Sequence, residues 1–130
     1  MKSFLTFLLI SSIYSGFVQE LGATHISKPV IEQSKTEYTI GENVILKGWV
    51  NYQGQPTPDV LLNAKVLRPD DSEIIDEFFM SDERGNFKFE FGTMNLLPGI
   101  YRIIITSQCL EVHRQVCTYQ SETLIIQLRE

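Results

Sequence analysis

Strict alternation of apolar and polar residues over short runs is the feature that most constrains this chain. The clearest case is Phe87, Phe89 and Phe91, which alternate with Lys88 and Glu90. A period of two places side chains on one face of a β-strand. Beyond the first two dozen residues, no stretch combines a sustained helical period with capping residues. The sequence therefore predicts an all-β fold.

Turn signals divide the alternating runs into about seven expected strands. Gly, Pro, Asn and Asp cluster between the runs, as they do in turns. The expected strands cover residues 38–40, 44–52, 60–66, 73–80, 87–91, 101–105 and 122–128. Strands of this length and spacing predict an antiparallel sandwich. Gly48 falls on the inward face of its strand, where it leaves room for a close neighbour.

The N-terminus has the pattern of a secretory signal peptide. Met1-Lys2 supplies a positive start, and residues 3–14 form an apolar core. This core is shorter than the roughly 20 residues that span a bilayer. Ser15, Gly16 and Ala23 are all small enough to precede the cut, and Leu21-Gly22-Ala23 is the favoured cleavage site. The alternative is an uncleaved anchor that continues the apolar core beyond residue 14.

Cleavage after Ala23 would leave 107 residues (130 − 23), which is enough for one domain. We expect residues 1–23 to be the signal peptide, 24–35 a flexible segment and 36–130 the sandwich domain. No later run reaches membrane-spanning length, so we expect no membrane span in the mature chain. The predicted location is secreted, or at the cell surface or envelope.

Three stretches resemble a known class of extracellular domain. They are Tyr38-Thr39-Ile40-Gly41-Glu42-Asn43-Val44, Ser81-Asp82-Glu83-Arg84-Gly85-Asn86-Phe87 and Leu97-Pro98-Gly99-Ile100-Tyr101. This cadence resembles immunoglobulin-like sandwich domains of bacterial and archaeal envelope proteins, and also macroglobulin-like and carboxypeptidase-regulatory-like domains. The resemblance covers roughly residues 36 to 128. It implies a secreted or surface-exposed sandwich that acts as a spacer, an adhesion unit or a binding module.

The two cysteines, Cys109 and Cys117, are expected to form a disulfide that staples a hairpin. Exported chains meet an oxidising environment, and a hairpin centred on His113 places the two cysteines opposite each other. The loop beyond them would project as a rigid finger with Val112, His113 and Arg114 at its tip. The alternative is a redox or metal-binding pair, but the spacing matches neither a CxxC motif nor a zinc site.

This disulfide conflicts with the pattern of the last strand. Uninterrupted pairing from the cysteines sets Ile103 opposite Thr123, whereas Leu124 has the inward phase of its strand. A slip of one residue turns every side chain to the other face. We therefore expect a bulge or irregular stretch between Cys117 and Glu122 that restores the inward phase.

Composition disfavours several classes of function. Lys and Arg number 11 against 16 Asp and Glu, for a net charge of −5, so the basic excess of a nucleic-acid binder is absent. The run Asp70-Asp71-Ser72-Glu73 could bind calcium, but calcium needs six to eight oxygens from converging segments, and a solvated turn is the favoured interpretation. No phosphate loop or catalytic pair of side chains is visible. We expect no metal, no cofactor and no enzymatic activity.

Trp49 and Tyr52 are the aromatic candidates for a contact site. Trp49 falls on the outward face of its strand, where a large ring can stack on a sugar or meet a protein. The alternative is that the N-terminal segment or a loop covers it. Four other apolar residues also fall outside the inward phase of their strands, and they would form an exposed patch if they cluster: Leu61, Leu67, Ile100 and Ile104.

Two functions follow from these observations. The first is an exported, non-enzymatic module that contacts an envelope or surface protein through the finger, an exposed edge strand or the Trp49 face. The alternative is a carrier or lectin-like module for a small ligand or glycan, with Trp49 and Tyr52 as stacking residues. A small hydrolase would need a constellation of polar side chains that the sequence does not display.

Overall fold

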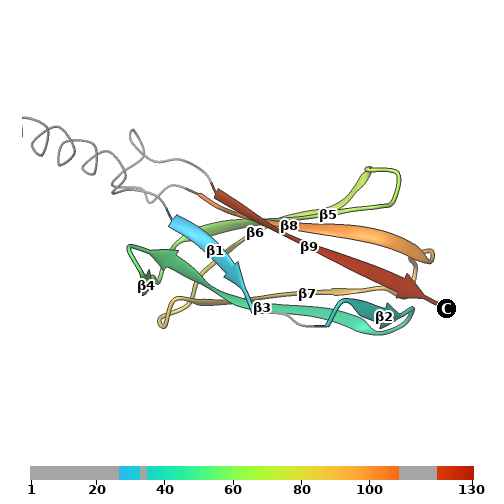
Figure 1. The fold of residues 1–130 in the computed structure, drawn as a ribbon, viewed down its shortest axis with the longest axis horizontal. Coiled ribbons are helices and arrows are strands. Elements are labelled where there is room, and N and C mark those ends of the chain that lie inside the picture. Colours follow the sequence, from blue (N-terminus) through green and yellow to red (C-terminus); the bar gives the residue numbers. More distant parts are fainter. Residues whose placement is uncertain (1–26, 33–34, 109–119) are drawn as a thin grey trace, which may run out of the picture.

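The computed structural model describes residues 27–32, 35–108 and 120–130. Within these ranges the chain forms nine β-strands arranged in two sheets (Figure 1). The strands are β1 (Ser27–Ile31), β2 (Glu37–Thr39), β3 (Asn43–Tyr52), β4 (Gln55–Pro56), β5 (Leu61–Leu67), β6 (Glu73–Met80), β7 (Asn86–Gly92), β8 (Gly99–Ser107) and β9 (Gln120–Arg129). No helix in these ranges has the length and apolar character needed to cross a membrane.

The two sheets form the layers of a sandwich. In the first sheet, β3 lies between β1 and β7, and the short β4 pairs with the end of β3. In the second sheet the strand order is β2-β9-β8-β5-β6. Every pairing is antiparallel except that of β2 with β9, which is parallel. Among the described strands, β6 therefore lies at an edge of the second sheet, and β7 lies at an edge of the first.

The expected number of about seven strands is too low, because β1 and β4 also form. All five residues of β1 pair with β3, although Ser27–Ile31 lies within the segment expected to be flexible. Pro29 explains why the sequence conceals this strand, since proline has no backbone N–H and is found in edge strands. Pairing with β3, and not a pattern within the segment itself, makes β1 a strand.

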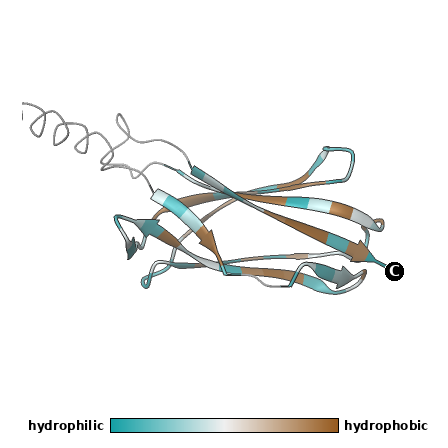
Figure 2. Cartoon of the chain, viewed as in Figure 1, coloured by the Kyte–Doolittle hydropathy of each residue, from teal (hydrophilic) through white to brown (hydrophobic). Residues whose placement is uncertain are grey.

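The core has the alternation that the sequence predicts. Phe87, Phe89 and Phe91 are all buried, and their three rings face the second sheet across the sandwich. Figure 2 shows hydrophobic residues along the strands of both layers. Each fully buried side chain of this size contributes roughly 1.5–3 kcal/mol. The other buried apolar residues are Tyr38, Val44, Leu46, Val50, Val60, Leu62, Ala64, Val66, Tyr101, Ile103, Ile105, Ile126 and Leu128.

Gly48 lies where two neighbouring strands approach β3 closely, as its inward position in the strand predicts. A Cβ atom at this position would overlap the backbone oxygen of Val30 in β1. It would also lie 2.6 Å from ring carbon Cζ of Phe87 in β7. The missing side chain therefore lets both neighbours pack against the centre of β3.

The inward phase of the last strand is confirmed. Ile103 pairs with Leu124, and the register stays regular to the pair Ser107–Gln120. Residues 120–122 therefore contain no bulge. The rest of the interval in which an irregularity was expected, 117–119, lies outside the described residues.

Candidate functional site

Trp49 and Tyr52 do not form one surface. Trp49 is half-buried on the outer face of the first sheet, with Val30 and Asn86 as its neighbours on β1 and β7. Tyr52 is three residues further along the same strand, and an odd separation along a strand places the two side chains on opposite faces. The structure therefore does not combine them into a stacking platform.

The predicted finger lies outside the described residues. Cys109, Cys117, Val112, His113 and Arg114 all fall in the interval 109–119. The expected disulfide and the expected contacts at the finger tip therefore stay predictions.

The acidic run 70–73 has the hydrogen bonds of a local turn. Asp70 accepts hydrogen bonds from the Ser72 hydroxyl (2.6 Å) and from the Ser72 backbone N–H (2.9 Å). The hydroxyl, and after it the backbone N–H, lowers the pKa of the Asp70 carboxyl. Asp71 pairs with the Arg102 guanidinium. Among the described residues, no three His, Cys, Asp or Glu side chains are grouped as a metal site would require.

An exposed apolar cluster lies across β5 and β6, and we call it the β6 patch: Leu61, Phe78 and Met80. Leu61 is the direct cross-strand neighbour of Met80, and Phe78 is the next residue along the same face of β6. Their exposed fractions are 39%, 63% and 51% respectively. Single exposed apolar residues are normal, but a contiguous group is typical of a contact surface.

The β6 patch exists because two consecutive phenylalanines point in opposite directions. Phe79 turns inward, where its ring stacks on that of Phe89 with the centroids 6.0 Å apart. It also meets the ring of Phe87 at 6.0 Å. Phe78 must then turn outward. The sequence pattern predicted that Leu61 is outward but missed Phe78 and Met80, because two adjacent phenylalanines leave the phase of the strand ambiguous.

The backbone of β6 has groups beside this patch that pair with no other described strand. Gln108 N–H donates to the Leu61 carbonyl (2.8 Å), so the backbone groups of Leu61 face β8. Ser81 N–H donates to the Val60 carbonyl (3.0 Å), so those of Val60 face β6. Hydrogen bonding alternates along an antiparallel pair. The remaining groups of β6 therefore face the free edge, and they belong to the residues paired with Leu61, Asn63 and Lys65: Met80, Phe78 and Asp76.

The free edge of β6 is acidic. Glu73, Asp76 and Glu77 lie in this strand, which has no basic residue. Asn63, which is buried, donates from Nδ2 to Asp76 Oδ1 (2.6 Å) and so orients that carboxylate. Lys65 Nζ lies 4.0 Å from a Glu73 carboxylate oxygen. Lys65 is also the direct cross-strand neighbour of Asp76, but within the described part of the chain its ion pair is with Glu73, and neither Asp76 nor Glu77 forms one.

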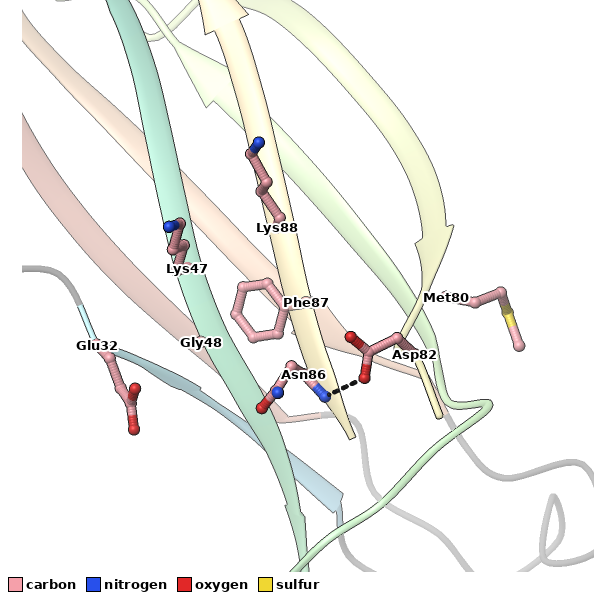
Figure 3. A pocket seen from close by; sticks show the side chains of 8 residues that line it. All are labelled: Glu32, Lys47, Gly48, Met80, Asp82, Asn86, Phe87 and Lys88. Atoms are coloured by element: carbon pink, nitrogen blue, oxygen red, sulfur yellow. Dashed lines mark hydrogen bonds between the residues drawn. The ribbon is translucent and has the colours of Figure 1, made fainter. Parts of the chain in front are cut away.

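A hollow of about 470 Å³ adjoins the end of the patch (Figure 3). The Asp82 carboxylate beside the hollow already accepts hydrogen bonds from the backbone N–H groups of Arg84 and Asn86, both at 2.9 Å. Its hydrogen bonds hold the turn between β6 and β7. The hollow is lined by Glu32, Lys47, Gly48, Met80, Asp82, Asn86, Phe87 and Lys88. Met80 is common to both features, although Figure 3 shows its side chain pointing away from the other side chains that line the hollow.

Comparison with known proteins supports the fold alone. No protein-family model and no curated protein matches the chain. A mutant β-glucosidase from Listeria innocua, solved with laminaribiose, matches 80% of this chain over 16% of its own length, with 10% identity and a TM-score of 0.51. This chain thus spans a small part of that enzyme.

Two smaller solved structures have weaker similarity. A conjugative transposon lipoprotein from Bacteroides eggerthii matches 80% of this chain over 97% of its own, with 5% identity and a TM-score of 0.48. The CARDB domain of a Pyrococcus furiosus protein matches 82% of this chain over 86% of its own, with 12% identity and a TM-score of 0.44. The described residues form an all-β, two-sheet domain by their own strand pairing, and these similarities assign the chain neither a family nor an activity.

Proposed function

We propose that this chain is an exported, non-enzymatic, immunoglobulin-like sandwich that binds another protein at the cell surface or envelope. The observation that carries the proposal is the β6 patch, which lies beside a strand edge that no other described strand covers. The N-terminal pattern of positive start, apolar core and small residues supports export.

The β6 edge is the best supported of the contact surfaces that the sequence suggests. It combines apolar side chains that are 39–63% exposed with backbone donors and acceptors that face solvent. Removal of contiguous apolar surface from water is the main driving force of association. The Trp49 face exposes less of its large aromatic ring to a partner, because Trp49 itself is half-buried.

The glycan-binding alternative has no comparable observation in its favour. A stacking site needs exposed rings on one surface. The two cross-strand neighbours of Trp49 are Val30 and Asn86, and Tyr52 belongs to the opposite face. The alternative therefore stays a prediction from sequence.

Site-specific photocrosslinking in cells that make the protein tests the proposal. A photoreactive amino acid is placed at Phe78, at Trp49 or at His113, and a control is placed at the exposed C-terminal residue Glu130. We expect one defined protein to be joined at position 78 and not at position 130. The Phe78→Ser variant should then fail to co-purify that same protein.

The outcomes of this experiment separate the parts of the proposal. Adducts at position 49 or 113, but not at 78, would keep the binding function and move its surface. No adduct at any of the three positions would overturn the binding function. Mass spectrometry of the same sample gives the mature N-terminus, and an intact leader with reduced Cys109 and Cys117 would overturn the export of the chain.

A further inference from the structure

We propose that the free edge of β6 accepts an extended, basic segment of another protein as an added antiparallel strand. The inference rests on the proposed function and specifies the chemistry of its partner. Strand addition of this kind draws affinity from backbone hydrogen bonds and specificity from alternate side chains.

The backbone of β6 fixes where the added strand must pair. Asp76, Phe78 and Met80 direct their N–H and C=O groups to the free edge, and their side chains lie on the exposed face. In an antiparallel ladder, residues that exchange both hydrogen bonds lie directly opposite each other. The added residues opposite Phe78 and Met80 would therefore lie on the same exposed face and should be apolar.

The acidic residues of β6 favour an added strand with positively charged side chains. Asp76 and Glu77 are exposed, and Asn63 already holds Asp76 in position through its 2.6 Å hydrogen bond. Lysine or arginine opposite these two carboxylates would form cross-strand pairs of opposite charge. In the direction of the added chain, the preferred pattern is apolar, any, apolar, basic, basic, with its first residue opposite Met80.

Glu77 has a further role, because it has the phase of the inward residues. Its cross-strand partner is Ala64, which is fully buried in the core. An inward-phase charge on an edge strand discourages indiscriminate pairing with other strands. Glu77 therefore admits a strand with a matching cation and disfavours an apolar or acidic one.

The same charges argue against a second copy of this chain as the occupant. Pairing of β6 with another β6 would bring together two strands with three acidic residues each and no basic residue. Whatever the register, neither copy could offer a cation to Asp76 or Glu77 of the other. Charge complementarity thus favours a basic partner of different sequence.

Nuclear magnetic resonance with a defined probe tests the inference. The probe is the synthetic peptide Thr-Val-Thr-Val-Lys-Lys-Thr, and its control carries Glu-Glu in place of Lys-Lys. In the full chain, the lysine peptide should shift the amide signals of Asp76, Phe78 and Met80 and slow their hydrogen exchange. The Trp49 amide should not change, and neither should any of these signals with the glutamate peptide.

A charge reversal in the protein sharpens the test. We expect Glu77→Lys to weaken binding of the lysine peptide about tenfold, because an attractive pair becomes a repulsive one, and to improve binding of the glutamate peptide. Glu130→Lys makes the same change in net charge at an exposed residue outside the strands and should leave both affinities unchanged. Lysine peptides N-methylated only at the valines should not bind, whereas methylation at the threonines should be tolerated.

Several results would overturn strand addition at β6. They are shifts confined to the Trp49 face, no shift up to the solubility limit of the peptide, or equal binding to Glu77→Lys and the unchanged chain. Protection of the β6 amides without peptide, rising with protein concentration, would mean that a second copy is the occupant. A crosslink at position 78 in cells without any peptide effect would keep the proposed function and reject only this mode of binding.

Discussion

Replacement of Gly48 by alanine is the most direct test of how the first sheet is held together. The new Cβ atom would overlap the backbone oxygen of Val30 and lie 2.6 and 2.8 Å from two ring carbons of Phe87. Overpacking of this kind costs about 1–3 kcal/mol, and a clash with backbone cannot be relieved by a change of rotamer. Alanine recovers roughly 0.5–1 kcal/mol through backbone entropy. Because the overlap with the Val30 oxygen is severe, we take the upper end of that range, about 3 kcal/mol, and after the recovery we expect a net loss of about 2 kcal/mol in the free energy of unfolding.

Urea unfolding measures this loss, with Gly92→Ala as the matched control. Gly92 is also in the first sheet, but a Cβ there would meet its nearest atom, Asn43 Oδ1, at an ordinary 3.5 Å. The control should be as stable as the unchanged chain or slightly more stable. In thermal unfolding, the loss at Gly48 corresponds to a fall of roughly 4–8 °C for each kcal/mol.

The double variant Gly48→Ala with Phe87→Leu identifies which clash dominates. Removal of the ring leaves the Val30 oxygen in place, so the double variant should not regain stability. Equal stability of Gly48→Ala and Gly92→Ala would refute the claim that β1 and β7 need a glycine at the centre of β3. Recovery in the double variant would show that the ring, and not the β1 backbone, sets the limit.

Three further predictions concern other parts of the molecule. Phe79→Ala should lower the free energy of unfolding by roughly 2 kcal/mol or more, because the Phe79 ring packs inside the sandwich. Phe78→Ala should change it by less than about 0.5 kcal/mol, because Phe78 is exposed. The reverse order in urea unfolding would contradict the assigned phase of β6. Thr93→Val should lower the free energy of unfolding by about 1–3 kcal/mol. The fully buried Thr93 hydroxyl donates a hydrogen bond to one turn carbonyl (2.7 Å) and accepts one from a turn N–H (2.9 Å), and valine can form neither. An unchanged thermal unfolding temperature would argue against these hydrogen bonds. Ser72→Ala should raise the pKa of the Asp70 carboxyl toward its ordinary value, as measured by carboxyl NMR titration. Because the pKa is lowered in the folded state, the Ser72 hydrogen bonds stabilise the protein at neutral pH, and this stabilisation is lost as the pH falls through and below about 4. An unchanged pKa would contradict the assigned cause.

Local patterning was sufficient to predict most of the strands. The alternation of Phe87, Phe89 and Phe91 gave both the strand and its buried face, because period two has only two possible phases and one buries three rings. The same argument predicted that Leu61 points outward. It failed for β1, where Pro29 obscures the pattern, and for Phe78, where two adjacent phenylalanines fit either phase.

The candidate site was predictable only in part. The sequence suggested an exposed edge strand as one contact surface, and it suggested outward apolar residues without saying which of them cluster. Leu61 meets Phe78 and Met80 because β5 pairs with β6. Ile100, which is 54% exposed, lies on β8 beyond the far side of β5 and does not join this patch.

The sequence by itself determined the all-β class, the inward face of most strands and the inward placement of Gly48. Each of these depends on the pattern of neighbouring residues along the chain. Only the tertiary structure decided which strands lie in which sheet and which strand is left at an edge. Those choices depend on pairing between residues far apart in sequence, as in β1 with β3 or β2 with β9. Placing β6 at an edge of the described sheet is what turns an ordinary alternating segment into a surface that combines free backbone groups, exposed apolar side chains and acidic side chains.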